Sequence, residues 1–136
     1  MKILLDTHTF IWLDSQPEKL SKTALNLCQE ENNELYLSMA SVWEMQIKSQ
    51  LGKLSFKISI SEIVNAQQQD NDIQNLDIRL EHIYRLSELP HHHNDPFDRL
   101  LLSQALEENM PIISADRKFN QSVILLPFGK IIYKQI

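Results

Sequence analysis

Short apolar segments alternate with amphipathic helical segments along this chain, and that alternation constrains the fold more than any other feature. The apolar segments predict strands over residues 3–5, 35–37, 73–76, 112–114, 123–126 and 131–133. The segments between them predict helices over 7–13 and 21–31, from Ser38 or Ser41 to about Gln50, from Ser61, over 80–86, and from Pro96. Strands that alternate with helices are typical of a parallel sheet, so we predict an α/β fold.

Length and composition limit the classes of protein that remain. A chain of 136 residues, 43% of them apolar, is expected to form one domain with an ordinary core. Its apolar runs are too short for a membrane span or a signal peptide, so we expect a cytoplasmic protein. Cys28 is the only cysteine, which excludes an internal disulfide and predicts a small buried side chain. The only glycines, Gly52 and Gly129, do not form a glycine-rich phosphate loop.

Four acidic residues occupy similar places relative to the predicted elements. Asp6 and Asp116 end or directly follow predicted strands. Glu44 and Asp98 lie near the starts of predicted helices. Ligands of α/β folds bind in the crevice at the carboxyl ends of the strands. We therefore expect at least three of these acids at one edge of the sheet.

Carboxylates that converge at one edge repel one another unless a cation holds them. The repulsion raises their pKa values, and a bound divalent ion keeps several of them ionised. An all-oxygen ligand set selects a hard ion, Mg²⁺ or Mn²⁺, over Zn²⁺. Such an ion can activate a water molecule and stabilise an in-line displacement at a phosphate. The acids together therefore indicate a site that cleaves phosphodiester bonds.

Each acid also has an ordinary structural explanation. Asp6 and Asp116 suit simple helix N-caps, and Asp98 suits the first turn of a helix, where an acid contributes about 0.3–1 kcal/mol. Glu44 suits a capping box with Ser41, and for this acid the structural alternative is strongest. Each of these explanations is sufficient when an acid is considered alone. Only the placement of the four as a set favours a site.

Other polar and aromatic residues are weaker candidates. Arg117 and Lys118 open a segment without Asp or Glu, which is either a basic rim beside the acids or a solvated tail. The histidines 91–93 are predicted to form a surface loop without metal ligands, although they precede Asp98 closely enough for a phosphate contact. Trp12 and Trp43 are expected in the core or at an interface rather than stacked on nucleic acid.

Four sequence blocks surround the four acids. They are Leu4-Leu5-Asp6-Thr7-His8-Thr9, Ser38-Met39-Ala40-Ser41-Val42-Trp43-Glu44, His92-His93-Asn94-Asp95-Pro96-Phe97-Asp98-Arg99-Leu100-Leu101, and Ile113-Ser114-Ala115-Asp116. With these blocks in this order, nearly the full length of the chain resembles the PIN-domain family, and within it the VapC-type toxins of bacterial toxin–antitoxin pairs. The chain departs from the family at Ser114, where Thr is common, and at Asn94, where Arg or Lys is usual.

The resemblance implies a fold, an activity and partners. It implies a single PIN-like domain over residues 1–136, with a central, mostly parallel sheet flanked by helices on both faces. It also implies endoribonuclease activity that depends on Mg²⁺ or Mn²⁺, a homodimer, and inhibition by a cognate antitoxin. The acids that bind metal in the family match Asp6, Glu44, Asp98 and Asp116. Our hypothesis takes Asp6 and Asp98 as the main ligands, with the other two acids completing the cluster.

The hypothesis also includes residues that would contact RNA phosphates, and two other functions compete with it. Arg99, Arg117 and Lys118 are the candidate phosphate contacts. A second hypothesis is phosphoryl transfer through an aspartyl-phosphate at Asp6, which the lack of a glycine-rich loop disfavours. A third is a non-catalytic interaction domain in which the acids are only caps, and it predicts no metal binding.

Overall fold

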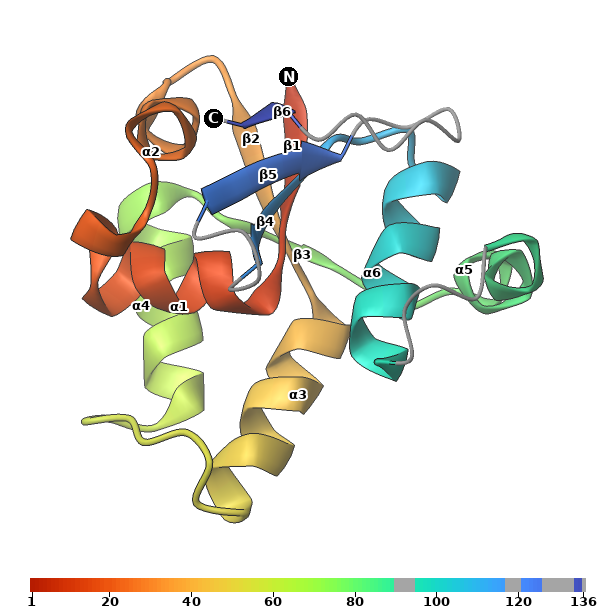
Figure 1. Cartoon of the computed structure of the whole chain (residues 1–136). Coiled ribbons are helices and arrows are strands. Elements are labelled where there is room, and N and C mark those ends of the chain that lie inside the picture. The colour runs from red at the N-terminus through yellow and green to blue at the C-terminus, as the bar shows by residue number, and fades with distance from the viewer. Residues whose placement is uncertain (90–94, 117–120, 126–133, 136) are drawn as a thin grey trace.

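A six-stranded sheet forms the centre of the structure, a computed structural model (Figure 1). The structure describes residues 1–89, 95–116, 121–125 and 134–135, and the side chains of 1–89 and 95–114. Its strands are β1 (Lys2–Leu5), β2 (Glu34–Ser38), β3 (Gln74–Leu76), β4 (Ile112–Asp116), β5 (Gln121–Leu125) and β6 (Lys134–Gln135), in the order β3-β2-β1-β4-β5-β6. The first four of that order pair in parallel, and β5 and β6 pair antiparallel at the edge. The predicted mostly parallel sheet is therefore confirmed, while the strand predicted at 131–133 lies outside the described residues.

The helices begin and end close to where the sequence predicts them. They are α1 (Thr7–Ser15), α2 (Lys22–Gln29), α3 (Met39–Gln50), α4 (Ile60–Asn71), α5 (Leu80–Tyr84) and α6 (Pro96–Glu107), with two 3₁₀ turns, η1 (Pro17–Lys19) and η2 (Arg85–Glu88). Of the two caps predicted for α3, Ser38 is the one used, since its side chain accepts from the amide of Ala40. The predicted start of α4 at Ser61 is wrong, because Ser59 accepts the amide of Glu62 and the helix begins at Ile60.

The segment over residues 80–86 differs most from its prediction. It forms the five-residue α5 followed by a 3₁₀ turn rather than one amphipathic helix. Leu80, Ile83 and Tyr84, the apolar residues at helical spacing in this segment, are exposed. His82 is buried in their place, with hydrogen bonds to the Arg79 amide and to Glu108. Hydrogen bonds of a histidine, and not hydrophobic periodicity, fix how this segment packs.

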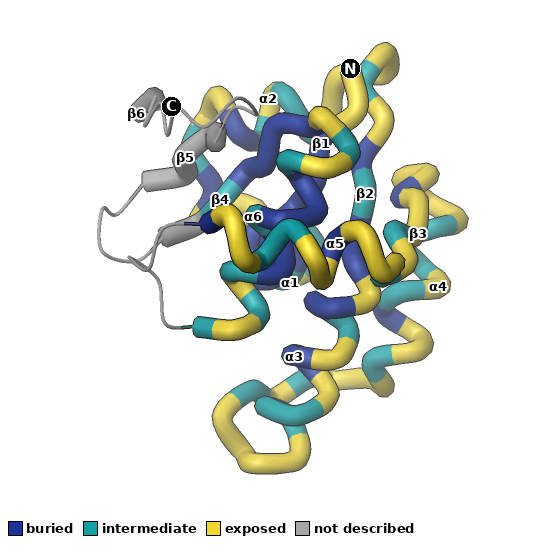
Figure 2. Tube along the Cα trace, turned by 90° about the vertical axis from the view of Figure 1, so that its right-hand side faces the viewer, coloured by how far each residue is buried: buried dark blue, intermediate teal, exposed yellow. Residues whose placement is uncertain are grey.

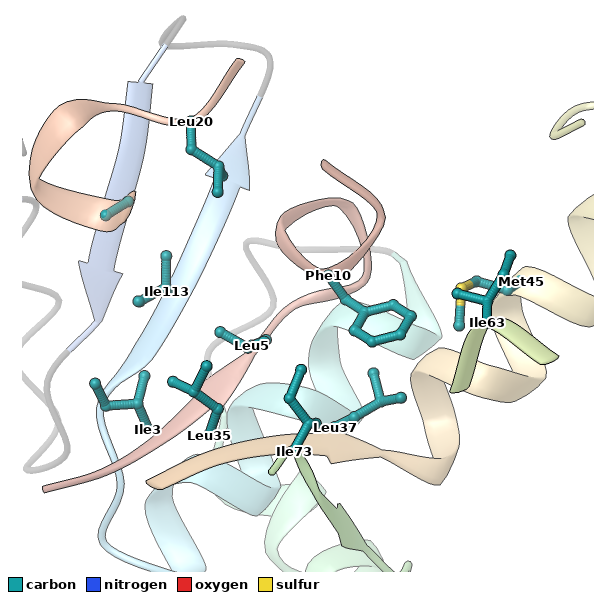
Figure 3. Close-up of a cluster of buried hydrophobic side chains, with 11 residues drawn as sticks. Ile3, Leu5, Phe10, Leu20, Leu35, Leu37, Met45, Ile63, Ile73 and Ile113 are labelled. Atoms are coloured by element: carbon teal, nitrogen blue, oxygen red, sulfur yellow. The ribbon is translucent and has the colours of Figure 1, made fainter. Parts of the chain in front are cut away.

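Side chains that alternate along the strands build a core on each face of the sheet. Ile3 and Leu5 of β1 pack with Phe10 of α1 in a cluster that we call the first core cluster, which also includes residues of α2, α3 and α4 (Figure 3). Leu4, which points the other way, packs with Leu100 and other residues of α6. Figure 2 shows the buried segments running through the centre of the chain trace. Helices therefore cover both faces of the sheet, as predicted.

Two further predictions concern the burial of the lone cysteine and the lack of a membrane span. Cys28 is half-buried against the first cluster, and burial raises the pKa of its thiol to about 11. It therefore behaves as a small apolar side chain, although it is only partly buried where full burial was predicted. In the described part of the chain, no helix has the length and apolar character needed to cross a membrane.

Candidate functional site

Asp6 stands where β1 ends and α1 begins. Its Oδ1 accepts a hydrogen bond from the amide of Thr9 at 2.8 Å, so the residue does cap α1. Its Oδ2 accepts from the hydroxyl of Ser114 on β4 at 2.7 Å. The residue is 8% exposed, and this burial raises its pKa, while the hydrogen bonds from Thr9 and Ser114 act in the opposite direction. Capping uses one carboxylate oxygen, and the other is held by the neighbouring strand.

Glu44 does not have the capping role that its spacing from Ser41 predicts. The cap of α3 is Ser38, so Ser41 is already inside the helix and Glu44 lies in its second turn. The carboxylate of Glu44 is buried instead. Its Oε1 accepts from Thr7 Oγ1 at 2.6 Å, and its Oε2 forms an ion pair with the ammonium group of Lys48. The capping box of Glu44 with Ser41, which was the strongest structural alternative for any of the four acids, is therefore wrong.

Asp98 lies in the first turn of α6, as predicted, and Asp95 provides the cap. Asp95 Oδ1 accepts the amides of Phe97 at 2.8 Å and of Asp98 at 3.1 Å. The pKa of Asp98 is raised to about 7, first by desolvation and then by the negative charges of Asp95, Asp6 and Glu44. These charges act on Asp98 because the N-terminal parts of α1, α3 and α6 meet at the carboxyl ends of the strands. The structure thus brings Asp6, Glu44 and Asp98 into one electrostatic environment.

The other candidate residues are placed less fully. Asp116 is the last residue of β4, next to Gln121 of β5, but its side chain is not among those described. Arg117 and Lys118, as well as the segment 90–94 with its histidines, lie outside the described residues. Arg99 is described, and its Nη2 donates to the carbonyl of Leu86 at 3.2 Å. The proximity of Asp116 to the other three acids therefore stays a prediction.

The chemistry of the donors at this edge fits a hard divalent cation. The carboxylate of Glu44 lies against the hydroxyl of Thr7, and that of Asp6 against the hydroxyl of Ser114. Asp98 is near enough for the charges of both acids to act on it, so the donors are all oxygen. Within residues 1–89 and 95–114, no three His, Cys, Asp or Glu side chains are close enough together to hold a metal ion. Mg²⁺ does not need three, because it commonly binds through one or two carboxylates and retains water molecules.

A polar network beneath the site escaped the sequence prediction. Gln104 of α6 is fully buried, its Oε1 accepts from the hydroxyl of Ser38, and its Nε2 donates to the carbonyl of Asp77 at 3.2 Å. It thereby ties α6 to the residue that caps α3. One signal was present in the sequence, since Gln104 interrupts the apolar stripe formed by Leu101 and Ala105.

The two tryptophans have different surroundings. Trp12 is half-buried against the first core cluster and meets the ring of His8 edge to face at 6.3 Å. Trp43 is 57% exposed, and its ring is 5.1 Å from that of Phe97. Trp12 therefore lies against the core, whereas Trp43 points out of α3 beside the first turn of α6, so that for Trp43 the interface alternative stays a prediction.

The raised pKa of Asp98 predicts that the metal-free protein loses stability as the pH rises. Between the ordinary pKa of 3.8 and about 7, the folded protein holds a proton on Asp98 that the unfolded chain has released. The free energy of unfolding therefore falls across this range and levels off above it. We expect thermal unfolding in a chelator to show a larger drop in Tm from pH 5 to pH 8 for the wild type than for Asp98→Asn. Equal drops in Tm for the two proteins would contradict the raised pKa of Asp98.

Comparisons with known proteins agree with this fold. A family model described as the PIN domain matches residues 3–123. A solved structure described as VapBC2 from Rickettsia felis, bound to a DNA fragment from their promoter, has a similar fold with a TM-score of 0.63. The two chains are 18% identical, and the match covers 88% of this chain and 91% of the other. The comparison with curated protein sequences gave no match.

Proposed function

The chain belongs to the PIN domain family, and on that premise we propose that it is a metal-dependent endoribonuclease and the toxin of a toxin–antitoxin pair. Members of this family are generally nucleases. The observation that carries the proposal is the 2.6 Å hydrogen bond from Thr7, the residue next to Asp6, to the buried carboxylate of Glu44 inside α3. It brings acids from two separate elements to one edge of the sheet, where their charges also act on Asp98. Helix caps alone do not require acids to share one edge of the sheet, whereas a metal site does.

The proposed roles follow from the contacts of each acid. Asp6 and Asp98 would hold the ion, with Glu44 and Asp116 completing the acidic cluster. A bound Mg²⁺ or Mn²⁺ supplies charge stabilisation and activates a water molecule for displacement at phosphorus. Ser114 and the amide of Thr9 hold the Asp6 carboxylate in one orientation. Thr7 does the same for Glu44 through the 2.6 Å hydrogen bond to its Oε1.

The substrate and partners belong to the same proposal. RNA would be the substrate, with phosphate contacts from Arg99, Arg117 and Lys118. A cognate antitoxin would be the protein partner, which the similarity in fold to a chain of the VapBC2 structure supports. A homodimer, a single domain over residues 1–136 and a cytoplasmic location are further parts of the proposal.

The competing functions receive less support from the contacts. Phosphoryl transfer through Asp6 needs a means of holding the phosphate donor, and the chain lacks the glycine-rich loop that commonly does so. A non-catalytic domain explains Asp6 and Asp95 as caps. It does not explain why Glu44 is buried inside α3 beside a lysine.

Removal of the metal tests the proposed function directly. Purified protein is incubated with labelled single-stranded and structured RNAs in Mn²⁺, in Mg²⁺, and in excess EDTA. We expect cleavage with either ion, background cleavage in EDTA, and recovery when Mn²⁺ is added back, because the acids would have no other means of activating water. Cleavage that continues unchanged in EDTA would rule out a metal-dependent mechanism.

A further inference from the structure

Lys48 is a positively charged residue that pairs with one of the acids of the proposed site. It follows Glu44 by one helical turn on α3, and its ammonium group pairs with Glu44 Oε2. The side chain of Lys48 is 28% exposed, while that of Glu44 is 4% exposed. A carboxylate this well buried is costly to leave without a counter-charge. Lys48 therefore places a positive charge directly against the buried carboxylate of Glu44.

The influence of Lys48 extends beyond Glu44. Desolvation and the neighbouring acids raise the pKa of Asp98, and the charge of Lys48 acts against them. The ammonium group thus lies within electrostatic range of two acids from different helices. It partly does what a bound cation does at such a site, because it lowers the repulsion between carboxylates.

We propose that Lys48 is the resident counter-ion of the acidic site and competes with the divalent metal for Glu44. The inference rests on the proposed function. In the metal-free protein, the ammonium group holds Glu44 Oε2 while Thr7 holds Oε1. A divalent ion that enters the site meets this positive charge, and the like charges repel. Lys48 is thus a positioning residue that acts through Glu44 and lowers the affinity of the site for metal.

The test is the binding of Mn²⁺ to the metal-stripped full chain, measured by calorimetry. We expect Lys48→Gln to bind Mn²⁺ on the order of tenfold more tightly than the wild type, since a unit charge near a divalent ion is removed. Lys48→Arg keeps the charge and should bind as the wild type does. Lys57→Gln is the matched control, because it removes a lysine that is exposed in the segment between α3 and α4, where solvent and salt screen its charge.

Thermal unfolding separates this role from a merely structural one. Without metal, Lys48→Gln should unfold at a lower temperature than the wild type, because Glu44 loses its counter-charge. Saturating Mn²⁺ should then raise its Tm by more than it raises that of the wild type. A lower Tm with unchanged or weaker Mn²⁺ binding would overturn the proposal. If neither protein bound Mn²⁺, the proposed metal-dependent function would fail as well, whereas binding by the wild type with no gain in Lys48→Gln would sink the inference alone.

Discussion

Asp6→Asn is expected to lower the rate of RNA cleavage by about a thousandfold, which corresponds to roughly 4 kcal/mol of activation free energy. Asparagine keeps a side-chain oxygen that can accept the amide of Thr9, and it is as good an N-cap as aspartate. Helix α1 should therefore form normally. The loss would come from the missing negative charge at the proposed metal position.

The measurement is the initial rate of cleavage in saturating Mn²⁺, with circular dichroism as the check on folding. Asp70→Asn is the matched control, since it removes the same charge from an exposed position near the end of α4. It should cleave at the wild-type rate. A folded Asp6→Asn protein that also cleaved at the wild-type rate would remove Asp6 from the site.

Phe10→Ala is expected to lower the free energy of unfolding by about 3–5 kcal/mol, a large part of the total stability of a domain of this size. The ring of Phe10 is 1% exposed and packs with Leu5, Leu37 and other members of the first core cluster (Figure 3). Its removal would leave a cavity beneath α1 that rigid strands cannot fill. Because α1 carries Asp6 at its start, the cavity lies close behind the proposed site.

Urea unfolding followed by circular dichroism measures this change. Leu51→Ala is the control, because Leu51 is 63% exposed at the end of α3 and its truncation should change the free energy of unfolding by less than about 0.5 kcal/mol. Similar losses for both variants would mean that the first cluster does not dominate stability.

The order of strands and helices could be predicted because hydrophobic periodicity and cap residues act locally. Asp95 and Pro96 at the start of α6 are the best example, since aspartate is favoured as an N-cap and proline at the first helical position, and the cap bonds are present. The α5 segment could not be predicted in this way. Its packing depends on contacts of His82 with Glu108, a residue that lies 26 positions later in the chain.

The same limit applies to the site. The spacing of Ser41 and Glu44 matches a capping box, but the helix begins earlier because Ser38 at the end of β2 is the better-placed cap. The partners of Glu44 are Thr7, which comes from another helix, and Lys48, whose spacing alone suggests only a surface ion pair. Local spacing therefore found the acids, but the contacts that hold them depend on how the three helices meet.

The central position of β4 has a consequence for the time at which the site can form during synthesis. β4 lies beside β1 in the sheet, although more than a hundred residues separate them in the chain. It supplies the hydroxyl of Ser114 to Asp6, and the carbonyl of Ile113 accepts from the Asp6 amide and the Thr9 hydroxyl. A nascent chain that has not yet released β4 from the ribosome lacks these partners. If the protein is the nuclease proposed above, its site is completed only after β4 has emerged from the ribosome, more than a hundred residues after the first acid has been made.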